Sequence, residues 1–154
     1  MKKKIYIDTT IPSYFYDNRK ETAYLINATK NWFKTEADKY EIYVSEATLV
    51  EAENGNYPNK SKIINFIRRW KVLPYDKILA QIVEVYIENQ LMPKEYGGDA
   101  LHLAYASHYK MDFLMTWNCE HLANANKKEH IRVINTRLGL YIPEIITPLE
   151  LTSA

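Results

Sequence analysis

Short apolar runs alternate along the chain with longer stretches in which apolar residues recur every three or four positions. Four short runs predict β-strands, at residues 5–7, 41–44, 113–117 and 145–147. Three of these runs are solidly apolar rather than alternating, a pattern typical of strands that are buried on both faces. The runs therefore favour a central sheet that helices cover on two sides.

Helical periodicity fills the segments between the runs. Apolar stripes at helical spacing predict helices within residues 23–33, 63–70, 78–86, 100–106 and 131–138, and Gly139 is placed to end the last of them. The 100–106 stretch is apolar almost all round, which predicts a central helix. Strands that alternate with helices predict an α/β fold, a three-layer α/β/α arrangement with a mostly parallel sheet. No internal boundary is visible, so residues 1–154 are expected to form one domain, with breaks near 54–60 and 92–98.

Composition limits the possible functions. Twenty Lys and Arg residues face nineteen Asp and Glu residues, which gives a net charge of +1, so any nucleic-acid binding must depend on a local basic patch. The single cysteine, Cys119, excludes an internal disulfide and a multi-thiolate zinc site. No apolar run is long enough for a signal peptide or a membrane span, so a cytoplasmic location is expected.

Four polar residues lie where an apolar run stops or a helix opens: Asp8, Glu51, Asp99 and Asn118. Ligand sites of open parallel α/β sheets lie in the crevice beyond the carboxyl ends of the strands, where residues far apart in sequence meet. Carboxylate and amide oxygens are ligands for hard divalent cations. The four residues therefore predict an oxygen-lined cation site.

Each of these residues also has a purely structural interpretation. Asp8 can cap a short helix at residues 11–16, and Asp99, which follows two glycines, can cap the central helix. Asn118 is a common type of turn residue. Ser45 is placed to cap the next helix, but the sequence alone does not prefer Glu51 over the neighbouring Glu46 or Glu53, since glutamates on helices are usually solvated.

The remaining polar residues do not form a recognisable site. A histidine on an apolar helix, such as His102, is more often a core residue than a metal ligand. Cys119 is expected to be a small buried residue. The chain has no HExxH motif, no glycine-rich phosphate loop and no GxSxG motif. These absences disfavour zinc-peptidase, nucleotide-binding and serine-hydrolase functions.

The segments IDTTIPSYF, SEATLVE, GGDALHLAYA and DFLMTWNCEHLAN, together with the tail RVINTRLGLYIPEIITPLEL, resemble the PIN-domain family of ribonucleases. Within that family the chain looks most like the VapC-type toxins of prokaryotic toxin–antitoxin pairs. The resemblance covers nearly the whole sequence. Its motifs are short, but their order and spacing are specific.

The resemblance implies a metal-dependent endoribonuclease that uses Mg²⁺ or Mn²⁺. The family's acidic positions fall on Asp8, Glu51 and Asp99, and the fourth falls on Asn118, which departs from the usual aspartate and removes one negative charge. Supporting hydroxyls would be Thr9, Ser45 and Thr116. Three carboxylates in one pocket repel one another, by roughly 4 kcal/mol per pair about 4 Å apart, and a cation relieves that repulsion. Whether one or two metal ions bind is left open.

An acidic pocket also repels RNA, so basic residues must hold the RNA backbone. Arg68, Arg69 and Lys71 beside Trp70, with Lys60 and Lys62, are the first candidates. The alternative is the solvated face of an amphipathic helix. A second possible rim consists of Lys127, Lys128 and Arg132.

The resemblance further implies an antitoxin protein as partner and a homodimer. Two other functions remain open at this point. One is a catalytically weak or inactive module with the same fold that binds RNA or protein, which the asparagine at position 118 favours. The other is a metal-dependent phosphatase or DNA nuclease that uses the same carboxylates.

Overall fold

A five-stranded parallel sheet forms the centre of the molecule in the computed structural model, which describes residues 1–94 and 97–152. The strands are β1 (Lys3–Ile7), β2 (Tyr40–Ser45), β3 (Lys71–Leu73), β4 (Phe113–Met115) and β5 (Glu144–Ile146). Their order is β3-β2-β1-β4-β5, and each neighbouring pair is parallel. Four strands overlap the predicted runs. β3 was not predicted, because it is a short edge strand in which only Leu73 is buried.

Helices connect the strands. They are α1 (Thr10–Phe15), α2 (Ala23–Thr35), α3 (Glu46–Glu53), α4 (Lys60–Arg68), α5 (Lys77–Glu88), α6 (Gly97–His108) and α7 (Ala125–Leu138), with two short 3-10 turns, Lys20–Thr22 and Ala37–Lys39. Ser45 caps α3 in a capping box with Thr48, and Gly139 ends α7 in the left-handed conformation, as predicted. Within the described residues, none of these helices has both the length and the apolar character needed to cross a bilayer.

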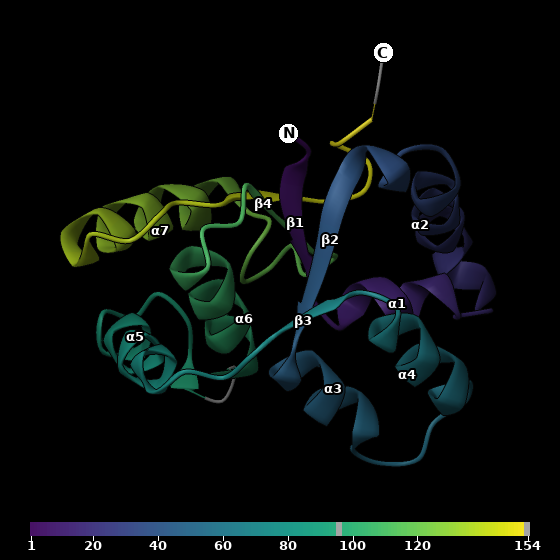
Figure 1. Ribbon diagram of the computed structural model, residues 1–154, viewed down its shortest axis with the longest axis horizontal. Helices are drawn as coiled ribbons and strands as arrows, with labels where there is room; N and C mark the ends of the chain where they lie inside the picture. Colours follow the sequence, from purple (N-terminus) through teal and green to yellow (C-terminus); the bar gives the residue numbers. More distant parts are fainter. Residues whose placement is uncertain (95–96, 153–154) are drawn as a thin grey trace.

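Alternate side chains of the strands supply two cores, one on each face of the sheet. Tyr6 of β1 and Leu114 of β4 pack with α5, α6 and α7, whereas Ile5 and Ile7 pack with α1, α2 and α4. Figure 1 shows the two groups of helices on opposite sides of the sheet. The arrangement confirms the predicted three layers. Residues 95 and 96, in the predicted 92–98 loop, lie outside the described residues.

The strand order brings the chemistry-bearing residues to one edge. From β1 the chain adds β2 and β3 on one side of the sheet, and then β4 and β5 on the other. The direction of strand addition therefore reverses beside β1, and such a reversal opens a crevice at the carboxyl ends of the strands. The segments that follow β1, β2 and β4, and the start of the buried helix α6, all face this crevice.

Candidate active site at the carboxyl edge of the sheet

Asp8 is the most deeply buried carboxylate at this edge, with 2% of its surface exposed. Its Oδ1 accepts hydrogen bonds from the backbone amide of Thr10, at 3.0 Å, and from the Thr10 hydroxyl, at 2.5 Å. Its Oδ2 accepts one from the hydroxyl of Thr116, at 2.5 Å. Burial raises the pKa of Asp8 although these bonds and the charge of His102 act to lower it. The contact with the first amide of α1 means that Asp8 also supports that helix, as the structural interpretation expected.

Glu51 reaches the same edge from α3. Its Oε2 accepts a hydrogen bond from the hydroxyl of Thr9, at 2.7 Å, and its Oε1 lies 2.7 Å from Nε2 of His102. Burial alone would raise the pKa of Glu51, but the contact with His102, its charge and the Thr9 bond together lower the pKa. The two competing glutamates are engaged elsewhere. Glu46 accepts the amide of Tyr75, at 3.1 Å, and Glu53 lies 3.5 Å from Arg68.

Asp99 lies in the first turn of α6 and pairs with Asn118, which follows β4. The Asn118 side-chain amide donates to Oδ2 of Asp99, at 2.9 Å, while its Oδ1 accepts the backbone amide of His121, at 3.0 Å. Burial raises the pKa of Asp99, and the Asn118 bond and the charges of His102 and His121 only partly offset that rise. Asn118 therefore forms a turn, as its structural interpretation expected, and its amide binds the Asp99 carboxylate, while its role as an oxygen ligand of a cation stays a prediction.

The structure pairs His102, which the sequence analysis expected in the core, with Tyr6, which it did not name. His102 is 2% exposed, and its Nδ1 lies 2.5 Å from the hydroxyl of Tyr6, which is fully buried. Burial lowers the pKa of His102, but contact with Glu51 and the charges of Asp8 and Asp99 outweigh this effect and raise it. The available sequence signal was spacing, since His102 follows Asp99 by one helical turn on the same face.

The three predicted hydroxyls occupy different places in the network. Thr9 binds Glu51, and Thr116 binds Asp8 and also accepts the backbone amide of Asn118, at 2.9 Å. Among the residues that the structure describes, Ser45 bonds to no carboxylate. Its Oγ lies 2.7 Å from the Tyr6 hydroxyl. Thr10, which the sequence reasoning did not name, makes more contacts with Asp8 than any of the three.

The residues fit a hard cation by donor type. Three carboxylates and an amide offer oxygen ligands, and the raised pKa values of Asp8 and Asp99 show that burial disfavours their charged forms. In residues 1–94 and 97–152, no three His, Cys, Asp or Glu side chains are close enough together to hold one ion in this conformation. Neighbouring donors bind each carboxylate instead. A bound cation would have to replace some of those donors and bring the carboxylates closer together.

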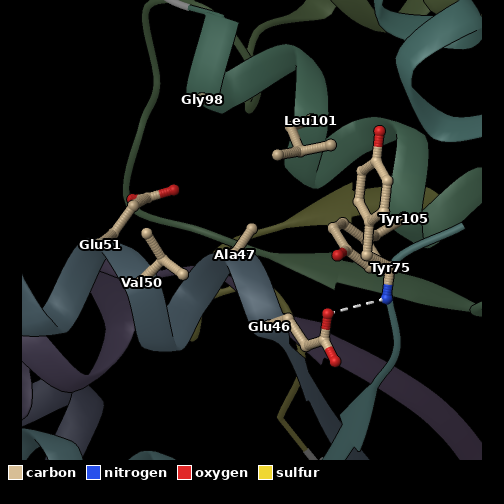
Figure 2. A pocket seen from close by; sticks show the side chains of 8 residues that line it. All are labelled: Glu46, Ala47, Val50, Glu51, Tyr75, Gly98, Leu101 and Tyr105. Atoms are coloured by element: carbon tan, nitrogen blue, oxygen red, sulfur yellow. Dashed lines mark hydrogen bonds between the residues drawn. The ribbon is translucent and has the colours of Figure 1, made fainter. Parts of the chain in front are cut away.

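A pocket of about 410 Å³ adjoins the acidic residues between α3 and α6. Its walls are mainly apolar, with Val50 and Ala47 on α3 facing Leu101 on α6 (Figure 2). Glu51 lies at one end of the pocket, and Glu46, bonded to Tyr75, lies at the other. The pocket and the acidic cluster therefore share one carboxylate.

The predicted basic residues lie on α4, at the residue that follows it, and at the start of the edge strand β3. Lys60 donates to two carbonyls at the end of α3, and Arg68 pairs with Glu53. Arg69 lies over the rings of Phe66 and Trp70, and Lys71 is 4.0 Å from Glu41. The second rim is also engaged: Lys127 binds the carbonyl of Leu91, Lys128 pairs with Glu150, and Arg132 pairs with Glu129.

Cys119 corrects one prediction. It is exposed rather than buried, because it lies in the turn beyond β4 and not in the strand.

Comparison with known proteins gives a likeness in fold. No family model matches the chain, and no curated protein matches it in sequence. Among solved structures, it resembles a chain of the crystal structure of VapBC2 from Rickettsia felis bound to a DNA fragment from their promoter. The TM-score is 0.55 and the sequence identity 16%, and the match covers 94% of this chain and 96% of the other. The protein thus has a PIN-like fold.

Proposed function

We propose that the protein is a metal-dependent endoribonuclease that acts as the toxin of a toxin–antitoxin pair. The observation that carries the proposal is the convergence of Asp8, Glu51 and Asp99, from three separate elements, at the carboxyl edge of a PIN-like sheet. Burial holds the pKa values of two of these carboxylates above their ordinary value, which is the state that binding of Mg²⁺ or Mn²⁺ would relieve. The likeness to a chain of a VapBC2 structure supports the toxin assignment.

Each residue has a defined part in this chemistry. Asp8, Glu51 and Asp99 would hold the cation, with Asn118 beside Asp99. When bound, the cation would activate a water for attack on a phosphodiester and neutralise the developing charge. Thr10 and Thr116 orient Asp8 by bonding to both of its oxygens, and Thr9 orients Glu51. Asn118 neutralises no charge, but its amide keeps the Asp99 carboxylate turned toward the strand edge.

The pocket beside Glu51 supports a nucleic-acid substrate. It is large enough for a nucleobase, and its apolar walls suit the faces of an aromatic ring. A phosphodiester at the acidic cluster would place its flanking nucleotide beside this pocket. Of the predicted basic residues, Lys62 on α4 and Arg69 just after it are exposed and would bind the backbone. Arg68, Lys60 and Lys71 would contribute less because each contacts an acidic or carbonyl group of the protein.

An antitoxin protein is the expected partner, in keeping with the VapBC2 likeness. A homodimer and a cytoplasmic location are part of the same proposal.

The decisive experiment is cleavage of a mixed RNA pool with Mg²⁺, with Mn²⁺ and with EDTA. Asp8→Asn and Asp99→Asn are expected to lower the rate by about 100-fold or more, because each removes a negative ligand of the cation. Asp38→Asn, at an exposed position, is the matched control, and circular dichroism checks folding. Metal-independent cleavage, or full activity in both site variants, would contradict the proposal. Single-stranded DNA and small phosphate esters, run in parallel, separate a ribonuclease from other phosphoesterases.

A second candidate function is a non-catalytic PIN-like module that binds RNA or protein. Two observations favour it: an amide at position 118, and carboxylates that are held apart by their own donors. Under this alternative, no RNA would be cleaved with any metal, and Asp99→Asn would alter stability alone.

A further inference from the structure

A line of polar side chains in close contact runs from the second strand to Glu51. The hydroxyl of Tyr6 lies 2.7 Å from Oγ of Ser45 and 2.5 Å from Nδ1 of His102. The other ring nitrogen of His102, Nε2, lies 2.7 Å from Oε1 of Glu51. Ser45, Tyr6 and His102 are all buried, with at most 2% of their surface exposed. Only the glutamate end of the line meets solvent.

At the outer end of this line, the proton between His102 and Glu51 can be carried only by the histidine nitrogen. Oε1 of Glu51 offers only lone pairs, so a close approach by Nε2 requires a proton on that nitrogen. In a neutral imidazole, Nδ1 then accepts, and the Tyr6 hydroxyl is there to donate to it. Burial raises the pKa of Tyr6, so the phenol keeps its proton. A doubly protonated ring would also carry a proton on Nε2, so the donor toward Glu51 is the same in both forms.

From this geometry we infer that His102 is a positioning residue that fixes the carboxylate of Glu51 for cation binding, and that Tyr6 sets the tautomer of His102. The inference rests on the proposed function. Nothing in the sequence or in the likeness to known structures assigns a role to either residue. Histidines bound to metals are commonly held by a carboxylate or carbonyl in this way, and here the order is reversed, with histidine holding the carboxylate.

Glu51 needs such a holder more than Asp8 does. Asp8 has a short side chain, is buried, and has both oxygens bonded by threonines of two adjacent segments. The Glu51 side chain has one more rotatable bond and is 39% exposed. Thr9 binds its Oε2, so His102 supplies the second point that fixes the carboxylate plane. The angle at Nε2 departs from that of an ordinary hydrogen bond although the distance is short, so electrostatic attraction carries much of the contact.

Four variants separate positioning from general stability. His102→Leu removes both ring nitrogens, and His102→Gln keeps an amide N–H at the place of Nε2. Tyr6→Phe removes only the donor to Nδ1. Tyr86→Phe is the matched control, because Tyr86 is an equally buried tyrosine on the same side of the sheet whose hydroxyl binds Asn135, away from the site.

Manganese affinity, measured by electron paramagnetic resonance on the full chain without RNA, is the first readout. We expect His102→Leu to weaken Mn²⁺ binding by about 10- to 100-fold, the usual effect of removing an outer-shell partner. His102→Gln is expected to recover most of this loss, and Tyr6→Phe to show a smaller loss. Tyr86→Phe should bind Mn²⁺ as wild type does. Wild-type affinity in folded His102→Leu, or an equal loss in both tyrosine variants, would overturn the inference.

Nuclear magnetic resonance provides the second readout, which does not depend on metal. The ¹⁵N shifts of His102 should show a proton on Nε2 in the wild type, and Tyr6→Phe should introduce the tautomer with its proton on Nδ1. The ¹³C shift of the Glu51 carboxyl should move in His102→Leu and in His102→Gln by different amounts. A wild-type proton on Nδ1 alone, or an unmoved Glu51 signal, would overturn the inference. If wild type binds no Mn²⁺, the proposed function fails, while these shifts still decide whether His102 holds Glu51.

Discussion

Two buried polar networks lie on the same side of the sheet, and both include residues of α6. The edge network consists of Tyr6, Ser45, Thr48, His102 and Glu51. The inner network consists of Tyr86, Ser107 and Asn135. Each has a fully buried tyrosine whose hydroxyl meets a polar partner at 2.5 or 2.6 Å. They differ in charge, and in whether their last polar group is buried or reaches solvent.

The inner network is neutral and closed. The Tyr86 hydroxyl donates to Oδ1 of Asn135, whose amide donates to Ser107 Oγ and to the carbonyl of Tyr141, both at 2.9 Å. Ser107 in turn donates to the carbonyl of Leu103, at 2.8 Å. The edge network instead ends on a half-exposed carboxylate and feels the charges of Asp8 and Asp99. Neutral, fully bonded groups stabilise a core, whereas three carboxylates around one histidine leave negative charge without a matching positive charge, which indicates a place where a ligand is expected.

The largest expected effect on stability concerns the inner network. Asn135→Ala should lower the free energy of unfolding by about 3 kcal/mol, because it removes a fully buried amide and deprives Tyr86 and Ser107 of partners. Urea denaturation measures the change, and Mn²⁺ binding should not alter. Asn126→Ala, at an exposed position of the same helix, is the control and should change stability by less than about 0.5 kcal/mol. A weakened Mn²⁺ site in folded Asn135→Ala would show that the two networks are coupled.

A smaller effect of opposite sign is expected at the acidic edge. Burial raises the pKa of Asp8, so its charged form subtracts stability as pH rises from the ordinary value of 3.8 through the raised value. Asp8→Asn should therefore stabilise the metal-free protein at neutral pH, although it impairs function. Chemical denaturation in EDTA at pH 7.5 and near pH 3 measures this, and the gain should vanish at the lower pH. If Asp8→Asn were instead less stable than the control Asp38→Asn at neutral pH, the hydrogen bonds from the threonines would outweigh the cost of burying the Asp8 charge. The contrast between the two networks would then not hold.

The smallest effect is an alkaline one in the inner network. Burial raises the pKa of Tyr86 to about 12, against 10.0 for the free side chain. The stability linked to its proton is fully present below pH 10 and is lost as pH rises through about 12. Tyr86→Phe should therefore flatten the fall in stability between these pH values, as followed by tyrosinate absorbance and urea denaturation. An unchanged slope, equal to that of Tyr24→Phe at a 71% exposed position, would mean that Tyr86 ionises as it does in the unfolded chain.

The sheet was predictable because its inner strands are buried on both faces and so form apolar runs. β3 escaped prediction since Lys71 and Val72 of this edge strand are exposed. The central helix α6 was recognised from its apolar character. The carboxylates were predictable from their place after strands or at a helix start, and the sequence left the choice among Glu46, Glu51 and Glu53 to the resemblance. Only the contacts with Thr9 and His102 single out Glu51 in the structure.

The contact between His102 and Tyr6 could not be recognised from the sequence, for a physical reason. Both have the burial that their apolar surroundings predict, and their role depends on a contact across 96 residues of chain. From the sequence, Asn118 was interpreted as the loss of one negative charge from the site. In the structure, its side-chain amide donates a hydrogen bond to Asp99. The sequence also could not show that Lys60 and Arg68 contact groups of the protein itself, and their binding of RNA stays a prediction.

Helix α6 carries Asp99 and His102 near one end and Ser107 near the other, and residues 103–106 are completely buried. A local opening of this helix would break both networks and expose the core between them, so its free energy approaches that of global unfolding. The site therefore persists for as long as the fold does. Asp99 and His102 thus meet a ligand on a helix whose backbone entropy was already lost during folding, although the carboxylates must still exchange some of their donors for a cation.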